Sequence, residues 1–359
     1  LSPHLGDYSF KNIVAYREKN PFLIEAMKPK YENNEIQVPY SSLNFPQYAH
    51  RDFRLFIQET ETNTQKKLAD FIRSSFPESN FLIVDSQASY GNILSYEREY
   101  EYSDFLDNHQ YWQHPWFDEG FSWNRSHYSI QNTPMFSECK NFGTFKSLKM
   151  LKPFDKPYTI SEYNHPFPND HLHEKFPMFG SWAAFHDWDA IYQFSFDEGS
   201  REINFINGYF SMSTNPIDFA FAPFIALSFR KSYVSTSKDF VHVKIPKSHI
   251  QKLNEKETVS VSKCLSDSFH AGWASTFDIA IIDDPNINDI QYEASINMNV
   301  KDKFVTDEIV WDGIYKVFTP KLKTITGFIG NSEKSIVNDL ELLNIQLKLN
   351  ENLKESATV

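Results

Sequence analysis

Short apolar runs alternate with helix-type segments between residues 81 and 230, and this alternation constrains the fold more than any other feature of the sequence. Four runs are predicted as strands: FLIVDS (81–86), FLDNHQYW (105–112), PYTISE (157–162) and AIYQFSF (190–196). Five segments are predicted as helices: 48–76, the charged SYEREYEYSDF (95–105), 143–151, 176–188 and 216–230. Strands and helices that alternate at this spacing predict βαβ units and a parallel sheet. The fold class is therefore α/β, with four strands that would make half of a (β/α)8 barrel.

The pattern changes after residue 231 to short β-type runs separated by turn residues. The runs are DFVHVKIP, FDIAIID, YEASINMNV, EIVWDG, IYKVFT and TITGFIG. They predict an antiparallel, β-sandwich-like domain over 232–345, after a barrel part over 1–231. The last residues, 346–359, are predicted to be a polar tail.

Charge and cysteine content narrow the function classes. The formal net charge is −12 and the chain has no long Lys/Arg run, which argues against a nucleic-acid partner. No apolar run approaches the roughly 20 residues of a membrane span, so no membrane contact is expected. Cys139 and Cys264 stand far apart without metal or redox spacing, and two free thiols are expected. We expect no cofactor.

Polar residues gather at the ends of three predicted strands, where α/β-barrel enzymes place their chemistry. They are Asp85, Ser86 and Gln87 at the first strand; Asn108, His109 and Tyr111 at the second; and Glu162, Asn164 and His165 at the third.

Three motifs in this order resemble the clan-A retaining glycoside hydrolases, the β-galactosidase-like and cellulase-like group. They are DNHQYWQHPWF (107–117), ISEYNHPFPN (160–169) and DWDAIYQFSF (187–196), and the β-type segment TDEIVWDG with YKVFTPKLKTITGFIG resembles the domain that follows such barrels. The resemblance covers about residues 40–335. It implies that the chain carries strands five to eight of a TIM barrel followed by the β-sandwich-like domain.

The resemblance also implies a role for Glu162 as the catalytic nucleophile of a double-displacement hydrolysis of oligo- or polysaccharide. A retaining glycosidase needs an ionised carboxylate and a protonated carboxyl about 5–5.5 Å apart. His109 or Tyr111, on the neighbouring strand, would hydrogen-bond Glu162 and keep it ionised. The other expected substrate contacts are Gln87, Trp112, Asn164, His165 and Trp188.

One part of the family pattern is missing. The acid/base Glu normally follows an Asn at the end of strand four, which we expect to lie upstream of Leu1. Asn34-Glu35 lacks a preceding apolar strand, and it is interpreted as a surface loop. The chain is thus interpreted as the C-terminal part of a glycosidase. A partner chain, self-association or a truncated sequence could each account for the missing strands. An extracellular or periplasmic location is favoured from the resemblance alone.

Other interpretations stay open. The absent acid/base allows a non-catalytic carbohydrate-binding half-barrel or pseudoenzyme. His165, His171, His173 and Glu174 could suggest a metal site, but without an HEXXH pattern a polar loop over a cleft is preferred and no metal is expected. Tryptophans 112, 116 and 123, in a long loop, could stack on sugars or pack the loop, and Trp188 could face the cleft or the core. Tryptophans 182, 273 and 311 are expected in the core.

Overall fold

The computed structural model describes residues 47–85, 92–120, 122–124, 127–138, 143–197, 206, 208–254, 260–265, 274–296, 304–327 and 357–358. Their contacts divide the chain into two compact units. Leu1–Phe81 with Ile250–Val259 forms the first, and Leu82–His249 with Ser260–Val359 forms the second. The predicted boundary at residue 231 lies inside the second unit, and the division into a barrel part and a β domain stays a prediction.

The first unit contains one long helix, α3 (Gln47–Ser75), which confirms the helix predicted over 48–76. The hydroxyls of Thr60 and Thr64 each donate, at 2.8 Å, to the carbonyl four residues earlier. Arg73 lies in the last turn, where a positive charge is stabilised by the carbonyl end of the helix. None of the helices in the described ranges is long and apolar enough to cross a membrane.

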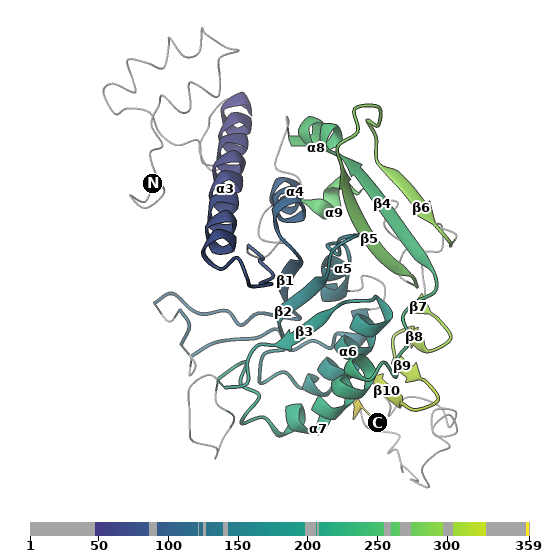
Figure 1. Ribbon diagram of the computed structural model, residues 1–359. Helices are drawn as coiled ribbons and strands as arrows, with labels where there is room; N and C mark the ends of the chain where they lie inside the picture. The colour runs from purple at the N-terminus through teal and green to yellow at the C-terminus, as the bar shows by residue number, and fades with distance from the viewer. Residues whose placement is uncertain are drawn as a thin grey trace. The chain divides into compact units, whose positions relative to one another are not determined.

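The second unit contains the predicted parallel sheet, in the order β1-β2-β3 (Figure 1). Its strands are β1 (Leu106–Tyr111), β2 (Tyr158–Asn164) and β3 (Ala190–Gln193). Both strand pairs are parallel. Helix α4 (Ile93–Tyr102) precedes β1, α5 (Gly143–Lys149) lies between β1 and β2 along the chain, and α6 (Lys175–Phe185) lies between β2 and β3. The α/β prediction is confirmed for this region.

The apolar run FLIVDS is not a strand over its described residues, 81–85. Phe81 and Leu82 are 57% and 67% exposed, so this apolar run is not a buried strand and the prediction is wrong. Asp104, just before β1, bonds this segment through Ile83. The amide of Ile83 donates to the Asp104 carboxylate at 2.7 Å, and the amide of Asp104 donates to the Ile83 carbonyl at 2.8 Å. The Ile83 amide thus donates to a side chain and not to the backbone carbonyl of a neighbouring strand, which explains why no strand forms.

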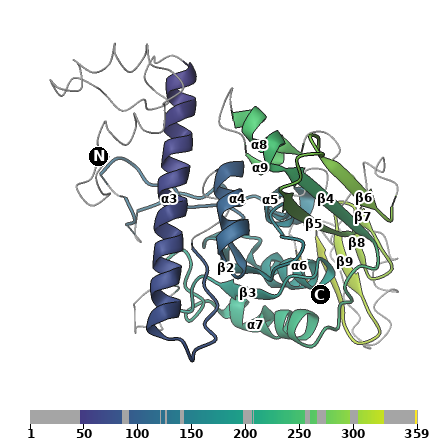
Figure 2. The same ribbon diagram turned by 45° about the horizontal axis from the view of Figure 1, so that its top comes forward.

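Helix α7 (Pro216–Ile225) follows β3 and continues as a π-helix over Ala226–Arg230, within the predicted 216–230. Asn215 begins it, with a side-chain oxygen that accepts the Ile217 amide at 3.1 Å. Helices α6 and α7 lie next to each other in both views (Figures 1 and 2).

The later strands form two sheets, and one of them corrects the prediction. Strands β4 (Phe240–Pro246), β5 (Thr276–Ile282) and β6 (Gln291–Ala294) have the order β5-β4-β6. Strand β4 pairs antiparallel with β6 but parallel with β5. The expected all-antiparallel domain is wrong here because α8 (Lys247–Asn254) and α9 (Val261–Cys264) stand between β4 and β5, and parallel neighbours need such a long connection.

The second of these sheets is antiparallel throughout its paired strands, as expected. Its order is β11-β10-β9-β8-β7. The strands are β7 (Phe304–Val305), β8 (Ile309–Trp311), β9 (Tyr315–Phe318), β10 (Lys323–Gly327) and β11 (Ala357–Thr358). Strand β11 comes from the segment predicted to be a polar tail, and it pairs with β10.

An aromatic core joins the antiparallel sheet to α6. The Trp182 ring stacks on Phe145 at 5.0 Å between centroids and lies 5.8 Å from Trp311 and 5.0 Å from Phe304. All residues of α6 are buried. Trp182 and Trp311 are fully buried, which confirms their expected place in the core, whereas Trp273 lies outside the described residues. The parallel sheet and the antiparallel sheet therefore share α6 as a common packing surface.

Candidate functional site

A β-bulge at Ser161 determines which way Glu162 points. Along β1 and β2, Asn108 pairs with Ile160 but His109 pairs with Glu162, so one residue of β2 is left over. The pairing of β2 with β3 skips at the same place. In a regular strand Glu162 would share the face of fully buried Ile160. The extra residue brings Glu162 to the face of Ser161, toward His109, as bulges next to functional sites commonly do.

The Glu162 carboxylate accepts a hydrogen bond from one residue of β1 and lies close to a second one. The Tyr111 hydroxyl donates to Glu162 Oε2. His109 Nδ1 lies 3.1 Å from the same oxygen. The Glu162 side chain remains 29% exposed, so a ligand can reach it. The structure thus brings together Glu162, His109 and Tyr111, three of the residues that the sequence placed at strand ends.

The Tyr111 ring has a fixed position. It stacks on Phe210 at 4.7 Å between centroids, with 24° between the ring planes, and meets the edge of His114 at 5.5 Å. Rings packed on two sides leave Tyr111 little freedom to rotate. Its hydroxyl is therefore held in an orientation toward Glu162.

A second carboxylate, Asp107, lies on the other side of His109. The Ser161 hydroxyl donates to Asp107 Oδ2 at 2.5 Å, and the Ser161 amide donates to Oδ1 at 3.0 Å. The Thr159 hydroxyl donates to Oδ1 as well. His109 Nε2 lies 2.6 Å from Ser161 Oγ and 3.5 Å from Asp107 Oδ2. Asp107 thus accepts three hydrogen bonds, and both of its carboxylate oxygens are engaged by β2.

Asp85, from the first predicted strand end, has a different partner. Its carboxylate forms an ion pair with Arg98 of α4 at 2.9 Å. Arg98 also contacts Glu99, a fully buried side chain whose pKa is raised to about 7 by burial and by Asp85. This cluster anchors the segment before β1. Ser86 and Gln87 lie outside the described residues.

Asn164 and His165 are buried beneath the site, each 1% exposed. Asn164 Oδ1 accepts the Lys175 ammonium at 3.0 Å, and its amide nitrogen donates to the Phe210 carbonyl at 3.0 Å. His165 Nε2 lies 2.8 Å from the Tyr163 hydroxyl. Burial, and next the charge of Lys175, lower the pKa of His165 well below its usual value, which favours a neutral ring. The polar atoms of both residues are turned toward protein groups.

The two tryptophans proposed as substrate contacts differ in environment. Trp188 is 4% exposed and packs edge-to-face on Tyr158 and Phe179. Trp112 is partly exposed, and its indole N–H donates to the Thr133 carbonyl at 2.8 Å. Both rings therefore pack against the fold around β2.

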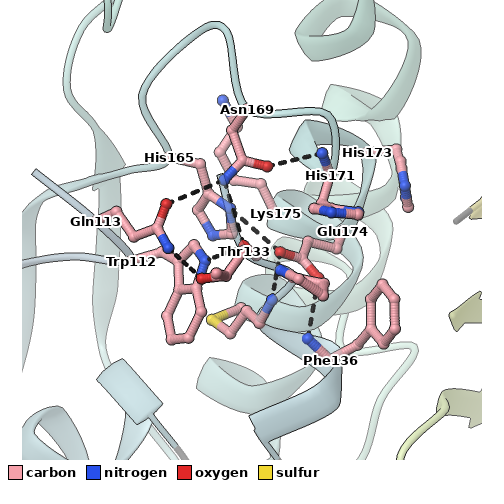
Figure 3. Close-up of polar contacts among 12 residues, drawn as sticks. Trp112, Gln113, Thr133, Phe136, His165, Asn169, His171, His173, Glu174 and Lys175 are labelled. Atoms are coloured by element: carbon pink, nitrogen blue, oxygen red, sulfur yellow. Dashed lines mark hydrogen bonds and ion pairs between the residues drawn. The ribbon is translucent and has the colours of Figure 1, made fainter. Parts of the chain in front are cut away.

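The histidine-rich segment after β2 surrounds a buried carboxylate instead of a metal site (Figure 3). Glu174 is 0% exposed and accepts the Met135 amide at 2.7 Å and the Phe136 amide at 3.0 Å. His165 Nδ1 is 3.6 Å away. Burial raises the pKa of Glu174 to about 8, although the two backbone donors oppose the shift. Within the described ranges, no group of three His, Cys, Asp or Glu side chains could hold a metal ion.

Two further tryptophans lie exposed in the loop that follows β1. Trp116 and Trp123 are 52% and 62% exposed. The Trp123 ring meets the edge of His114 at 5.5 Å, and His114 in turn contacts Tyr111. A ring path thus leads from the Glu162 partner to an exposed aromatic surface, of the kind on which flat sugar faces stack.

The sequence interpretation missed Asp107 and Ser161, which complete the polar chain around His109. A signal for Asp107 was present, because it precedes His109 and Tyr111 by two and four residues and so belongs to the same strand face. Ser161 could not be found in this way. Its position depends on a bulge that only the pairing of β2 with its neighbours reveals.

Comparison with known proteins gives no relative for this chain: no family model, no curated protein and no solved structure matches it. Its chemistry therefore has to be inferred from the contacts of Glu162, His109, Tyr111 and Asp107.

Proposed function

We propose that this chain carries the nucleophile of a retaining, β-galactosidase-like O-glycoside hydrolase that acts on oligo- or polysaccharide. One observation supports this most directly. Glu162 stands near the C-terminal end of the middle strand of a parallel sheet, partly exposed, with the Tyr111 hydroxyl donating to one carboxylate oxygen and His109 Nδ1 3.1 Å from the same oxygen.

The arrangement suits nucleophilic attack on an anomeric carbon. The Tyr111 hydroxyl on Oε2 holds the carboxylate in one orientation. No contact of this kind is recorded for Oε1 among the described residues, so the second oxygen is available to a substrate. Attack would form a glycosyl ester at Glu162, which water then hydrolyses with overall retention of configuration.

The parallel order β1-β2-β3 fits the later strands of a (β/α)8 barrel, with Glu162 on the seventh. Sites in that fold lie at the C-terminal ends of the strands, where Tyr111 and Glu162 are found. Asp107 is committed to Ser161 and Thr159, so a carboxyl group other than Asp107 is proposed as the acid/base.

The exposed ring of Trp123 supports a saccharide substrate. It extends the aromatic path of Tyr111 and His114 away from Glu162, so a sugar chain bound at the carboxylate could stack on it. We place Asn164, His165 and Trp188 behind this surface. Their proposed contribution is to position β2 and the residues after β3, and direct sugar contact is assigned to Tyr111, His109 and the exposed rings.

The alternative is a carbohydrate-binding module that does not cleave its ligand. It is favoured by the commitment of Asp107 to three donors, which leaves no second carboxyl group assigned as a proton donor to Glu162 within the described part of the chain. Under this alternative the protein binds a neutral polysaccharide but releases no reducing ends from it.

The deciding experiment is substitution of Glu162 by Gln. We expect the wild-type protein to hydrolyse β-linked oligosaccharides with retention, and Glu162→Gln to lower kcat by roughly a thousandfold or more with an unchanged melting temperature. Glu119→Gln, a change of the same type at an exposed position of the loop after β1, should leave kcat unaltered. Full activity in Glu162→Gln would refute the assignment, and binding without hydrolysis by wild type would select the alternative.

A further inference from the structure

The side chain of Asn164, at the end of β2, is held in one orientation. It is buried, and its oxygen Oδ1 accepts the Lys175 ammonium at 3.0 Å and the His165 amide at 2.8 Å. A lysine ammonium can only donate, so it must face the oxygen of an amide and not the nitrogen. Because the oxygen is fixed in this way, the amide nitrogen of Asn164 points away from Lys175.

On its other side, the amide nitrogen of Asn164 joins two chain segments that follow β3. It donates to the carbonyl of Phe194 and, at 3.0 Å, to the carbonyl of Phe210. The two segments also pair with each other, because the Ser195 amide donates to the Phe210 carbonyl at 3.1 Å and the Met212 amide donates to the Ser195 carbonyl at 3.0 Å. A carbonyl is only an acceptor, so the N–H₂ group of an Asn can bind two of them at once.

The rings of the same two phenylalanines pack against Tyr111. Phe210 stacks on Tyr111 at 4.7 Å between centroids, and Phe194 meets it edge-on at 6.3 Å, with 88° between the ring planes. The two phenylalanine rings also contact each other, at 6.2 Å. The residues whose carbonyls Asn164 binds are thus the residues whose rings surround Tyr111, and the Tyr111 hydroxyl donates to Glu162.

We propose that Asn164 is a positioning residue that acts on Glu162 through Tyr111. The Asn164 amide holds the backbone of the two phenylalanines, their rings hold the Tyr111 ring, and the Tyr111 hydroxyl then meets the carboxylate. Lys175 contributes by fixing the direction of the amide. The arrangement can be tested without any activity, and its catalytic meaning rests on the proposed glycosidase function.

Two substitutions test the Asn164 amide, and a second buried asparagine provides the matched control. Asn164→Asp replaces the donating nitrogen by an oxygen, and Asn164→Ala removes both polar groups. Asn169 is buried as well and accepts the His171 amide at 2.7 Å. Its amide nitrogen donates to Gln113 Oε1 at 3.2 Å and to the Thr133 carbonyl at 3.3 Å (Figure 3). Asn169→Asp therefore disturbs the same kinds of hydrogen bond, but at neither of the two phenylalanines.

The position of the Tyr111 ring is measured by 19F NMR of the full chain labelled with 3-fluorotyrosine. The Tyr111 signal is assigned by its loss in Tyr111→Phe, and Phe210→Leu gives the shift caused by losing the stacked ring. We expect both Asn164 variants to move this signal in the direction of the Phe210→Leu shift, and Asn169→Asp to leave it in place. An unmoved signal in a folded Asn164 variant, or an equal shift in Asn169→Asp, would overturn the proposal. If neither Asn164 variant folds, Asn164 is required for the fold as a whole and the proposal fails as well.

Activity gives a second readout. If the chain hydrolyses glycosides, Asn164→Asp should lower kcat/KM by about tenfold. In the Tyr111→Phe background the same substitution should lower kcat/KM by less than about twofold, because the hydroxyl through which Asn164 acts is already absent. Independent, additive losses in the double variant would overturn the proposal. If the Tyr111 signal behaves as expected but the wild type hydrolyses no glycoside, the positioning of Tyr111 stands and the glycosidase function fails.

Discussion

Two glutamates of the same chain segment show how burial separates an accessible carboxylate from a sealed one. Glu162 and Glu174 each lie near a histidine and each accept hydrogen bonds through the carboxylate. Glu162 is 29% exposed and faces a hydroxyl and an imidazole, both on β1. Glu174 is fully buried and faces the backbone amides of Met135 and Phe136.

The difference lies in what each carboxylate can still do. The donors on Glu174 belong to the backbone, so its role is to fix the segment that precedes α5. The donor on Glu162 is the side chain of Tyr111, and the carboxylate remains partly open to solvent. A carboxyl group whose environment excludes water loses much of its tendency to ionise, and the pKa of Glu174 is accordingly raised to about 8 by burial. The buried region also contains Lys175 and Asp218, an ion pair at 2.5 Å with both side chains inaccessible.

The largest effect is expected from breaking this ion pair. Burial lowers the pKa of Lys175 and raises that of Asp218, so each charge depends on the other. Lys175→Met should lower the free energy of unfolding by about 3–5 kcal/mol, because it leaves Asp218 buried and uncompensated. Urea unfolding measures the change. The double variant Lys175→Met/Asp218→Leu should recover most of the loss, and an equally unstable double variant would show that the Lys175 contact to Asn164 matters more than the pair.

The next effect concerns Glu174 and pH. Its folded-state pKa of about 8 lies above the ordinary carboxyl value, so the folded chain binds the proton more tightly. The resulting stability is complete below the unfolded pKa and is lost as pH rises through about 8. Between pH 6.5 and 8.5 the free energy of unfolding of the wild type should therefore fall relative to that of Glu174→Gln, by an amount on the order of a few kcal/mol. Melting temperatures of the two proteins across this pH range measure the difference.

Glu174→Gln removes the titrating group. The variant should be less stable than the wild type at the lower pH, because the amide nitrogen of Gln replaces one of the two oxygens that accept the Met135 and Phe136 amides and cannot accept a hydrogen bond. Only the difference between the two pH curves is diagnostic. The pKa of His165 is lowered in the folded chain, so this residue makes stability fall as pH drops below the ordinary histidine pKa. This contribution has the opposite sign to that of Glu174 and is expected in both proteins. Parallel curves for wild type and variant would contradict the shift at Glu174.

The smallest effect comes from a pair of Tyr→Phe changes that test both regions with the same chemistry. Tyr111→Phe removes the hydroxyl that donates to Glu162 and should lower kcat/KM by about tenfold to a hundredfold, while the melting temperature changes little. Tyr163→Phe removes the buried hydroxyl next to His165 and should cost about 1–3 kcal/mol of stability with kcat/KM unchanged. A loss of stability without a loss of kcat/KM in Tyr111→Phe, or a loss of kcat/KM without a loss of stability in Tyr163→Phe, would contradict this division of roles between the two tyrosines.

The order of helices and strands could be predicted from the sequence because it depends on local periodicity. The helices α3, α5 and α6 and the strands β1, β2 and β3 fall within a few residues of their predicted ranges. The buried core tryptophans Trp182 and Trp311 were predictable for the same reason, since bulky aromatic side chains within regular elements are most stable in a core.

The tertiary structure alone decided the rest. The strand predicted over 81–86 failed because Asp104 bonds the segment in place of a neighbouring strand, and the parallel pairing of β4 with β5 required helices that the apolar pattern did not indicate. The bulge at Ser161 arises from the pairing of β2 with two partners, and it turns Glu162 toward His109. Periodicity in one segment shows which residues form a strand. Whether a carboxylate is buried, like that of Glu174, or accessible, like that of Glu162, depends on packing against residues from distant parts of the chain.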